Sequence, residues 1–161
     1  MSLNSVKTYI ATQGATVSLT SLIWKNAVVA AQRPKRGKAG FNVFVIVGRV
    51  RRREQRATMP RGPAEKESVY DVDVMFYAEH TDAKSGGDHF DALIENACQV
   101  YRTTTGNPTL TDSFGAASSY LTDVGETMDV EILPPFFTDD SESRTAFQGI
   151  LTFNLREILT A

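Results

Sequence analysis

The sequence is poor in the residues that build metal, redox and disulfide sites. Its 161 residues include one cysteine and two histidines. A single cysteine excludes an internal disulfide and any zinc site built on several cysteines. No apolar run reaches the roughly 18 residues that a membrane-spanning helix needs, and the N-terminus lacks the pattern of a signal peptide. We therefore expect a soluble, intracellular-type domain with no membrane partner.

Motifs of the common enzyme classes are missing as well. The sequence contains no glycine-rich phosphate loop of the GxxxxGK[ST] or GxGxxG type, no GxSxG elbow and no HExxH zinc motif. Cys98 has no base at a spacing that would activate it, so we interpret it as a packing residue. We expect no enzyme, no catalytic residues, no cofactor and no bound metal.

One group of histidines and acidic residues allows both a metal-binding and a structural interpretation. His80 and His89 lie near Asp82, Asp88 and Asp91. These side chains are of the kind that ligate a divalent metal. A polar loop that leads into an acidic first turn of a helix explains the same residues, and we favour this explanation.

A pair of aspartates offers a second site for metal-dependent chemistry. Asp71 and Asp73 are two residues apart on a predicted strand, so both project from one face, as paired carboxylates do in some hydrolases. The alternative is a solvated strand face that lies opposite Arg51 or Arg53 across a hairpin. We favour the alternative, because no third carboxylate or lysine completes a recognisable metal site.

The periodicity of apolar residues predicts an α+β fold. An antiparallel sheet with a long basic hairpin is expected to pack against a central helix and an N-terminal helical segment. We predict a single domain over 1–161, with a projecting arm at about 49–66 whose distal part is loose. Helices are predicted at 2–13 and at 19–31, where a helix is favoured over a strand. The central helix is predicted to start with a capping box at 85–88 and to carry an apolar stripe over 90–101, with Cys98 off that stripe. The predicted strands are 41–53, 69–77, 128–132 and 147–155.

Charge is unevenly distributed along the chain. Residues 33–66 contain eleven basic residues and two acidic ones, whereas 67–161 contain seventeen acidic residues and four basic ones. The overall net charge is only -2. Such segregation favours an anionic partner or head-to-tail docking between copies of the chain.

The arm and an acidic loop are the candidate interaction sites. The arm contains the arginines Arg49, Arg51, Arg52, Arg53, Arg56 and Arg61. The candidate acidic partner surface is formed by Asp139, Asp140 and Glu142. Dense arginines suit nucleic-acid phosphates, but no aromatic residues are interleaved with them and no sequence-reading motif accompanies them. We therefore favour docking of the arm on a neighbouring subunit, and one arm could serve both purposes.

The chain resembles the tail terminators and tail-completion (head-to-tail joining) proteins of long-tailed bacteriophages in size and in element order. The resemblance includes the N-terminal helical part and the long hairpin with its basic tip. It also includes the helix HFDALIENACQVYR and the closing segment DVEILPPFFTDDSESRTAFQGILTFNLREIL. It covers most of the chain without a diagnostic motif. The Ser, Gly and Thr-rich stretch 109–127 is longer than a minimal version of this fold requires.

The resemblance implies a structural protein of the virion, located at the head–tail interface and made in the host cytoplasm. It implies a homo-oligomeric ring, usually a hexamer, that caps the tail tube protein and contacts head-completion or connector proteins. Genomic DNA would pass through the lumen with transient, non-specific contact. Alternatives are another head–tail connector, a neck or a minor tail protein, and, outside the virion, a nucleic-acid-binding domain without sequence preference.

Overall fold

A computed structural model describes residues 3–35, 37–56, 66–104, 119–123, 128–137 and 144–159, and these form an α+β fold on one seven-stranded sheet. The central helix and the long hairpin predicted from the sequence are both present. In chain order the elements are α1 (Leu3–Gly14), β1 (Asn26–Val29), β2 (Asn42–Arg56), β3 (Lys66–His80), α2 (Ala83–Thr104), β4 (Ser119–Asp123), β5 (Asp129–Ile132), β6 (Phe136–Phe137) and β7 (Thr145–Leu159).

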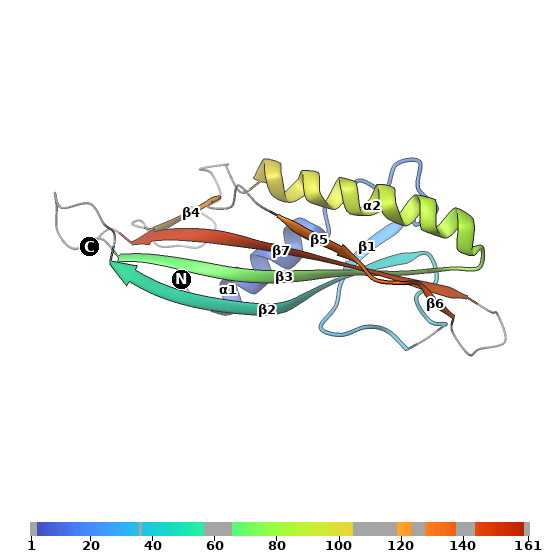
Figure 1. Ribbon diagram of the computed structural model, residues 1–161, viewed down its shortest axis with the longest axis horizontal. Coiled ribbons are helices and arrows are strands. Elements are labelled where there is room, and N and C mark those ends of the chain that lie inside the picture. Colours follow the sequence, from blue (N-terminus) through green and yellow to red (C-terminus); the bar gives the residue numbers. More distant parts are fainter. Residues whose placement is uncertain are drawn as a thin grey trace.

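Three strands of fifteen residues each form the body of the sheet. They lie in the order β2, β3, β7 and are antiparallel, and each spans about 50 Å at the usual rise of 3.4 Å per residue (Figure 1). All fifteen residues of β3 pair with β7, from Lys66 opposite Leu159 to His80 opposite Thr145. The prediction of a loose distal hairpin is therefore wrong for the described part, because β7 extends along its whole length.

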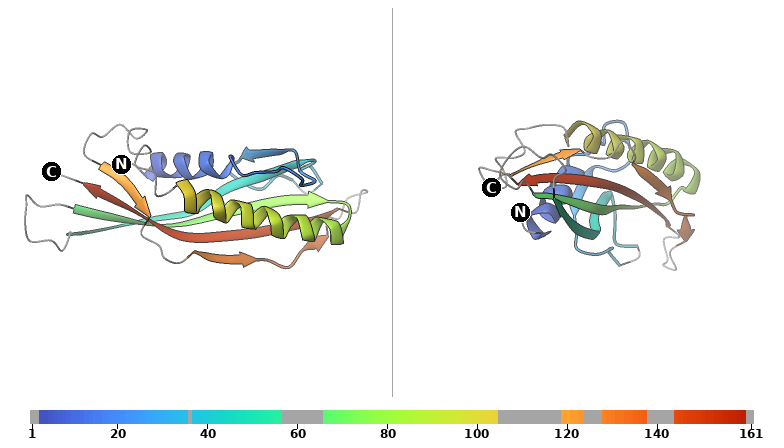
Figure 2. Two further views of the ribbon diagram at one scale, coloured as in Figure 1. Left: turned by 90° about the horizontal axis from the view of Figure 1, so that it is seen from above. Right: turned by 60° about the vertical axis from the view of Figure 1, so that its left-hand side comes forward.

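The two edges of the sheet are built from short strands. β1 pairs with β2 only over Asn42–Val45, and it does so in parallel. On the other side, β4, β5 and β6 pair in turn with β7 (Figure 2). The sheet is therefore antiparallel, as predicted, except for the parallel pairing of β1 with β2.

The segment 19–31 was expected to be a helix and is not. It contains irregular backbone up to Lys25 and then β1. The indole N–H of Trp24 donates a hydrogen bond of 3.0 Å to the backbone oxygen of Glu79, and the backbone N–H of Lys25 donates to the oxygen of Phe41. These contacts to distant segments fix an extended backbone, and the β-branched Val28 and Val29 suit a strand better than a helix.

Both helices pack on the same face of the sheet, as predicted. The hydroxyl of Tyr101 in α2 donates a 2.9 Å hydrogen bond to the backbone oxygen of Ile10 in α1. In the apolar stripe of α2, Val100 is partly buried, and the stripe packs with the strands in one core. The other members are at most 2% exposed: Phe90, Leu93, Ile94, Ala97 and Tyr101. Cys98 belongs to that core, so its predicted position off the stripe was wrong. Burial of each large side chain in this core contributes roughly 1.5–3 kcal/mol.

The start of α2 differs from the predicted capping box. Asp82 caps the helix: its Oδ1 accepts hydrogen bonds from the backbone N–H groups of Lys84 (2.9 Å) and Ser85 (3.1 Å). The helix therefore begins three residues earlier than the Ser85–Asp88 spacing suggested. Among the described residues, no helix is long and apolar enough to cross a membrane.

Candidate interaction site

A bulge in β2 determines which arginines share a face. Val47 pairs with Val74 and Val50 pairs with Val72, so Gly48 and Arg49 together lie opposite a single residue of β3. A bulge of this kind adds one residue to a strand and reverses the alternation of its side chains. Val47 and Val50 consequently both pack toward the helix-covered core. The intervening Arg49 projects from the opposite, open face.

Arg49, Arg51 and Arg53 share this open face with the two aspartates of β3. Arg53 Nη2 lies 2.9 Å from Asp71 Oδ1, and Arg49 Nε lies 3.3 Å from Asp73 Oδ2. The prediction that the aspartates face the arginines across the hairpin is confirmed, with Arg49 and Arg53 as the partners. Each exposed pair stabilises the fold by only about 0.2–1 kcal/mol.

The two aspartates are also held by neighbours that do not suit a metal site. The hydroxyl of Thr152 donates a 3.0 Å hydrogen bond to Asp73 Oδ1, so both oxygens of Asp73 have partners within the protein. Within the described ranges no group of three or more His, Cys, Asp or Glu side chains lies close enough to hold an ion.

His80 accepts a 3.0 Å hydrogen bond at Nδ1 from the backbone N–H of Asp82, beside the cap of α2. His80 and Asp82 therefore lie together at the start of α2, where Asp82 caps the helix.

The remaining arginines of the predicted arm are placed differently. Arg51 is exposed between the two ion pairs and forms no ion pair with a described residue. Arg52 alternates to the other face and pairs with Glu54. β2 ends at Arg56, opposite Lys66. The side chain of Arg56 and the whole of Arg61 lie outside what the structure describes.

The acidic loop at Asp139, Asp140 and Glu142 also lies outside the described residues. The structure instead places two exposed acids, Asp129 and Glu131, on the edge strand β5. Their pairing with Thr152 and Ile150 of β7 puts both on the open face. The alternating DVEI pattern in the sequence was the available signal for them, but the position of this strand at an edge was not predictable from it.

A basic loop covers one end of the open face. The 30–41 connection crosses the sheet on the side away from α2 (Figure 1). Its Ala39 is buried against Tyr77 and Ala146. Arg33, Lys35 and Lys38 are exposed, and none of them forms an ion pair with a described residue. No acidic residue occurs before Glu54, so the N-terminal third of the chain has only positive charges.

A buried carboxylate fixes the position of this loop. Glu79 is 1% exposed, and its Oε1 accepts hydrogen bonds from the hydroxyl of Tyr77 (2.5 Å) and the backbone N–H of Gly37 (3.1 Å). Gly37 has a φ of 75°, which is easily adopted only by glycine. No local pattern in the sequence predicts the contact with the loop, because Gly37 lies 42 residues from Glu79 along the chain. The hydrogen bond between the buried Glu79 side chain and the backbone of Gly37 holds the loop against the sheet.

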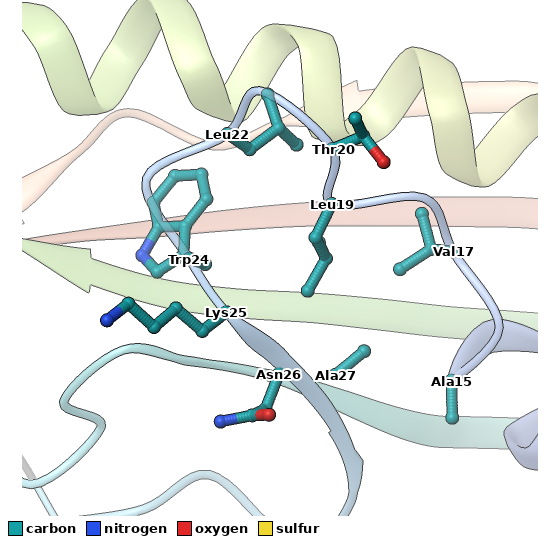
Figure 3. A pocket seen from close by; sticks show the side chains of 9 residues that line it. All are labelled: Ala15, Val17, Leu19, Thr20, Leu22, Trp24, Lys25, Asn26 and Ala27. Carbon is teal, nitrogen blue, oxygen red and sulfur yellow. The ribbon is translucent and has the colours of Figure 1, made fainter.

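One hollow among the described residues lies beside the segment that follows α1. It has a volume of about 590 Å³ and lies between the 15–25 segment and the start of β1 (Figure 3). Ala15, Val17, Leu19, Leu22 and Ala27 supply most of its lining. The polar ends of Lys25 and Asn26 point away from Val17 and Leu19 (Figure 3). No pair of titratable groups converges on this hollow.

No protein-family model and no curated protein matches the chain.

Proposed function

We propose that this chain is a structural protein of a bacteriophage virion, a tail terminator that forms a ring. The ring would cap the tail tube, join it to the head or neck, and let DNA pass through its lumen. The resemblance in size and element order supports this proposal. So does an α+β fold whose described helices cover only one face of a long sheet, because the edge strands β1 and β5 and the arginines of β2 on the opposite face then have exposed side chains for contact with partners.

The observation that carries the proposal is the pairing of the arm's arginines with the protein's own aspartates. Among the three arginines of the arm on the open face, Arg49 and Arg53 are compensated by Asp73 and Asp71, and Arg51 forms no ion pair with a described residue. Tight binding to a nucleic-acid backbone draws on many uncompensated cations, since each phosphate contact adds to affinity. An arm in which most arginines on the open face are paired with aspartates suits contacts with other proteins, together with weak contact to passing DNA.

The alternative of a metal-dependent hydrolase has less support from the geometry. A catalytic carboxylate pair needs oxygens that are free to bind a metal. Asp71 and Asp73 instead direct oxygens to arginine and threonine side chains of the same sheet. Another position in the same assembly, such as a connector, neck or minor tail protein, shares the structural role. Labelling of virions with an antibody against this chain would separate these positions.

The first test is the mass of the purified protein by light scattering across about 0.05–0.5 M salt, with a parallel titration of short duplex DNA. We expect discrete oligomers, with ring-shaped particles in negative-stain electron microscopy, and little DNA binding at moderate salt. A monomer that binds duplex DNA tightly, with an affinity that falls steeply as salt rises, would overturn the proposal. That result would establish the nucleic-acid-binding alternative.

A further inference from the structure

We propose that copies of this chain join side by side through opposite edges of the sheet. The β5 edge of one copy would contact the β1–β2 edge of the next, with Asp129 facing Arg49 of the neighbour and lying one row away from its Arg51. This inference rests on the proposed ring assembly and names its interface. The occupant of each edge is therefore a second copy of the same chain.

The two edges carry opposite charge on the open face. Residues paired straight across the sheet form rows, and one row runs from Arg49 through Asp73 and Thr152 to Asp129. The row thus has an exposed cation at one edge and an exposed acid at the other. On one side of this row, the next row of the open face runs from Ile46 through Met75 and Ile150 to Glu131; on the other side, the next row begins at Arg51. Charges arranged in this way attract a copy in the head-to-tail orientation and repel the reverse one.

The same edges carry exposed apolar side chains on the helix-covered face. Val29 of β1 is 49% exposed, and Ile132 of β5 is 46% exposed. Both belong to one row, which continues through Val45, Phe76 and Gly149. Contact between Val29 of one copy and Ile132 of the next would bury both side chains. Such burial stabilises an interface by about 25 cal/mol per Å² of apolar surface removed from water.

Backbone groups at the two edges are also unpaired within the described sheet. The N–H of Ala30 donates to the oxygen of Val45, and the N–H of Leu133 donates to that of Gln148. Alternate residues of a strand direct their backbone groups to opposite sides. The N–H and C=O groups of Val29 and Ile132 therefore point away from the sheet. Edge strands of this kind readily pair with another chain.

The position of the two edges favours a closed ring over a filament. Val29 and Ile132 lie in one row, so a rotation without a rise along the strands brings them together. A heterologous contact of this type closes when the rotation closes and grows as a helix when it does not. Arg49 lies one strand further in than Val29, because β1 covers β2 only as far as Val45. An arginine side chain spans that step of about 4.8 Å.

The test is disulfide cross-linking between engineered cysteines. A chain carrying both Val29→Cys and Ile132→Cys is expected, under mild oxidation with copper phenanthroline, to form a ladder of covalent oligomers up to the size of the ring. An equal mixture of the two single variants should give mixed dimers. The native Cys98 is buried and does not interfere. The matched control pairs Val29→Cys with Asp91→Cys, an exposed position on α2, and should give no ladder.

Charge reversal provides an independent readout. Asp129→Lys should raise the dissociation constant of the oligomer by about tenfold. Adding Arg51→Glu should restore assembly, which a merely misfolded variant would not do. An oligomer that yields neither the ladder nor the rescue would overturn this interface and leave the proposed function standing. A monomer without a ladder would also overturn the interface, and the DNA titration would then decide the function.

Discussion

Two adjacent glycines near the start of α2 should respond in opposite ways to the same substitution. A Cβ at Gly86 would lie 2.7 Å from Phe147 Cε2, 2.8 Å from Phe147 Cζ and 3.1 Å from His80 Cβ. A Cβ at Gly87 would meet its nearest neighbour, Phe147 Cε1, at 3.9 Å, an ordinary contact. We predict that Gly86→Ala destabilises the fold and that Gly87→Ala stabilises it.

The magnitudes follow from two opposing terms. Replacing a helical glycine with alanine gains about 0.5–1 kcal/mol in either position. At Gly86 the added methyl group also overpacks the core, at a cost of about 1–3 kcal/mol. The ring of Phe147 cannot move away freely, because it is 5% exposed and stacked on Phe90 with centroids 5.6 Å apart. The two variants should therefore differ in free energy of unfolding by about 1–3 kcal/mol.

Urea denaturation followed by circular dichroism measures this difference directly, with the two variants as each other's control. For a chain of this size, the same difference shifts the melting temperature by roughly 2–4 °C per kcal/mol. Equal stabilities for the two alanine variants would refute the close approach of α2 to Phe147. The double variant Gly86→Ala with Phe147→Leu should show a coupling energy of about 0.5–3 kcal/mol, because the smaller side chain removes the clash.

Three further predictions concern the ends and the core of α2. Asp82→Ala should lower stability by about 0.5–2 kcal/mol through loss of the helix cap, whereas Asp82→Asn should retain most of it in thermal unfolding. Burial raises the pKa of Tyr101 above its ordinary value of 10.0. The contribution of protonated Tyr101 to the free energy of unfolding is thus fully present below pH 10 and is lost as the pH rises further, because the hydroxyl loses its proton at a lower pH in the unfolded chain. Alkaline titrations should show a shallower decline for Tyr101→Phe, which at neutral pH costs about 1 kcal/mol of hydrogen bonding to Ile10. Burial also raises the pKa of the Cys98 thiol, so at pH 8 a thiol reagent should modify it far faster in urea than in the native protein; equal rates would contradict its burial.

The elements that the sequence predicted well are those governed by local periodicity. The stripe from Phe90 to Tyr101 repeats at helical spacing, and the structure buries it against the sheet. The strand predicted at 69–77 likewise lies within β3. It also predicted that Asp71 and Asp73 face arginines across the hairpin. In each case the information lies within one element or between two neighbouring strands.

The elements that the sequence did not predict depend on partners far along the chain. Segment 19–31 is extended because Trp24 bonds to the backbone of Glu79, 55 residues away. The exposed position of Asp129 and Glu131 at an edge follows from pairing with β7, which local patterns do not encode. The helix start was misplaced because residues 85–88 have the spacing of a capping box, whereas Asp82 caps the helix and Gly86 lies inside it, close to Phe147.

The central position of β3 has a consequence for how the chain folds. On one side β3 pairs with β2, the element directly before it in the chain. On its other side it pairs with β7, which follows every other element along the chain. β7 supplies Phe147, Leu151, Phe153 and Leu155 to the core. Folding is slowed because the entropy cost of closing such a long loop precedes the contacts that compensate for it. Until β7 pairs with β3, β3 has an exposed apolar edge that is prone to aggregation. A nascent chain therefore needs β7 before its core can form, and shortening the chain before β7 should yield an aggregating fragment instead of a smaller folded domain.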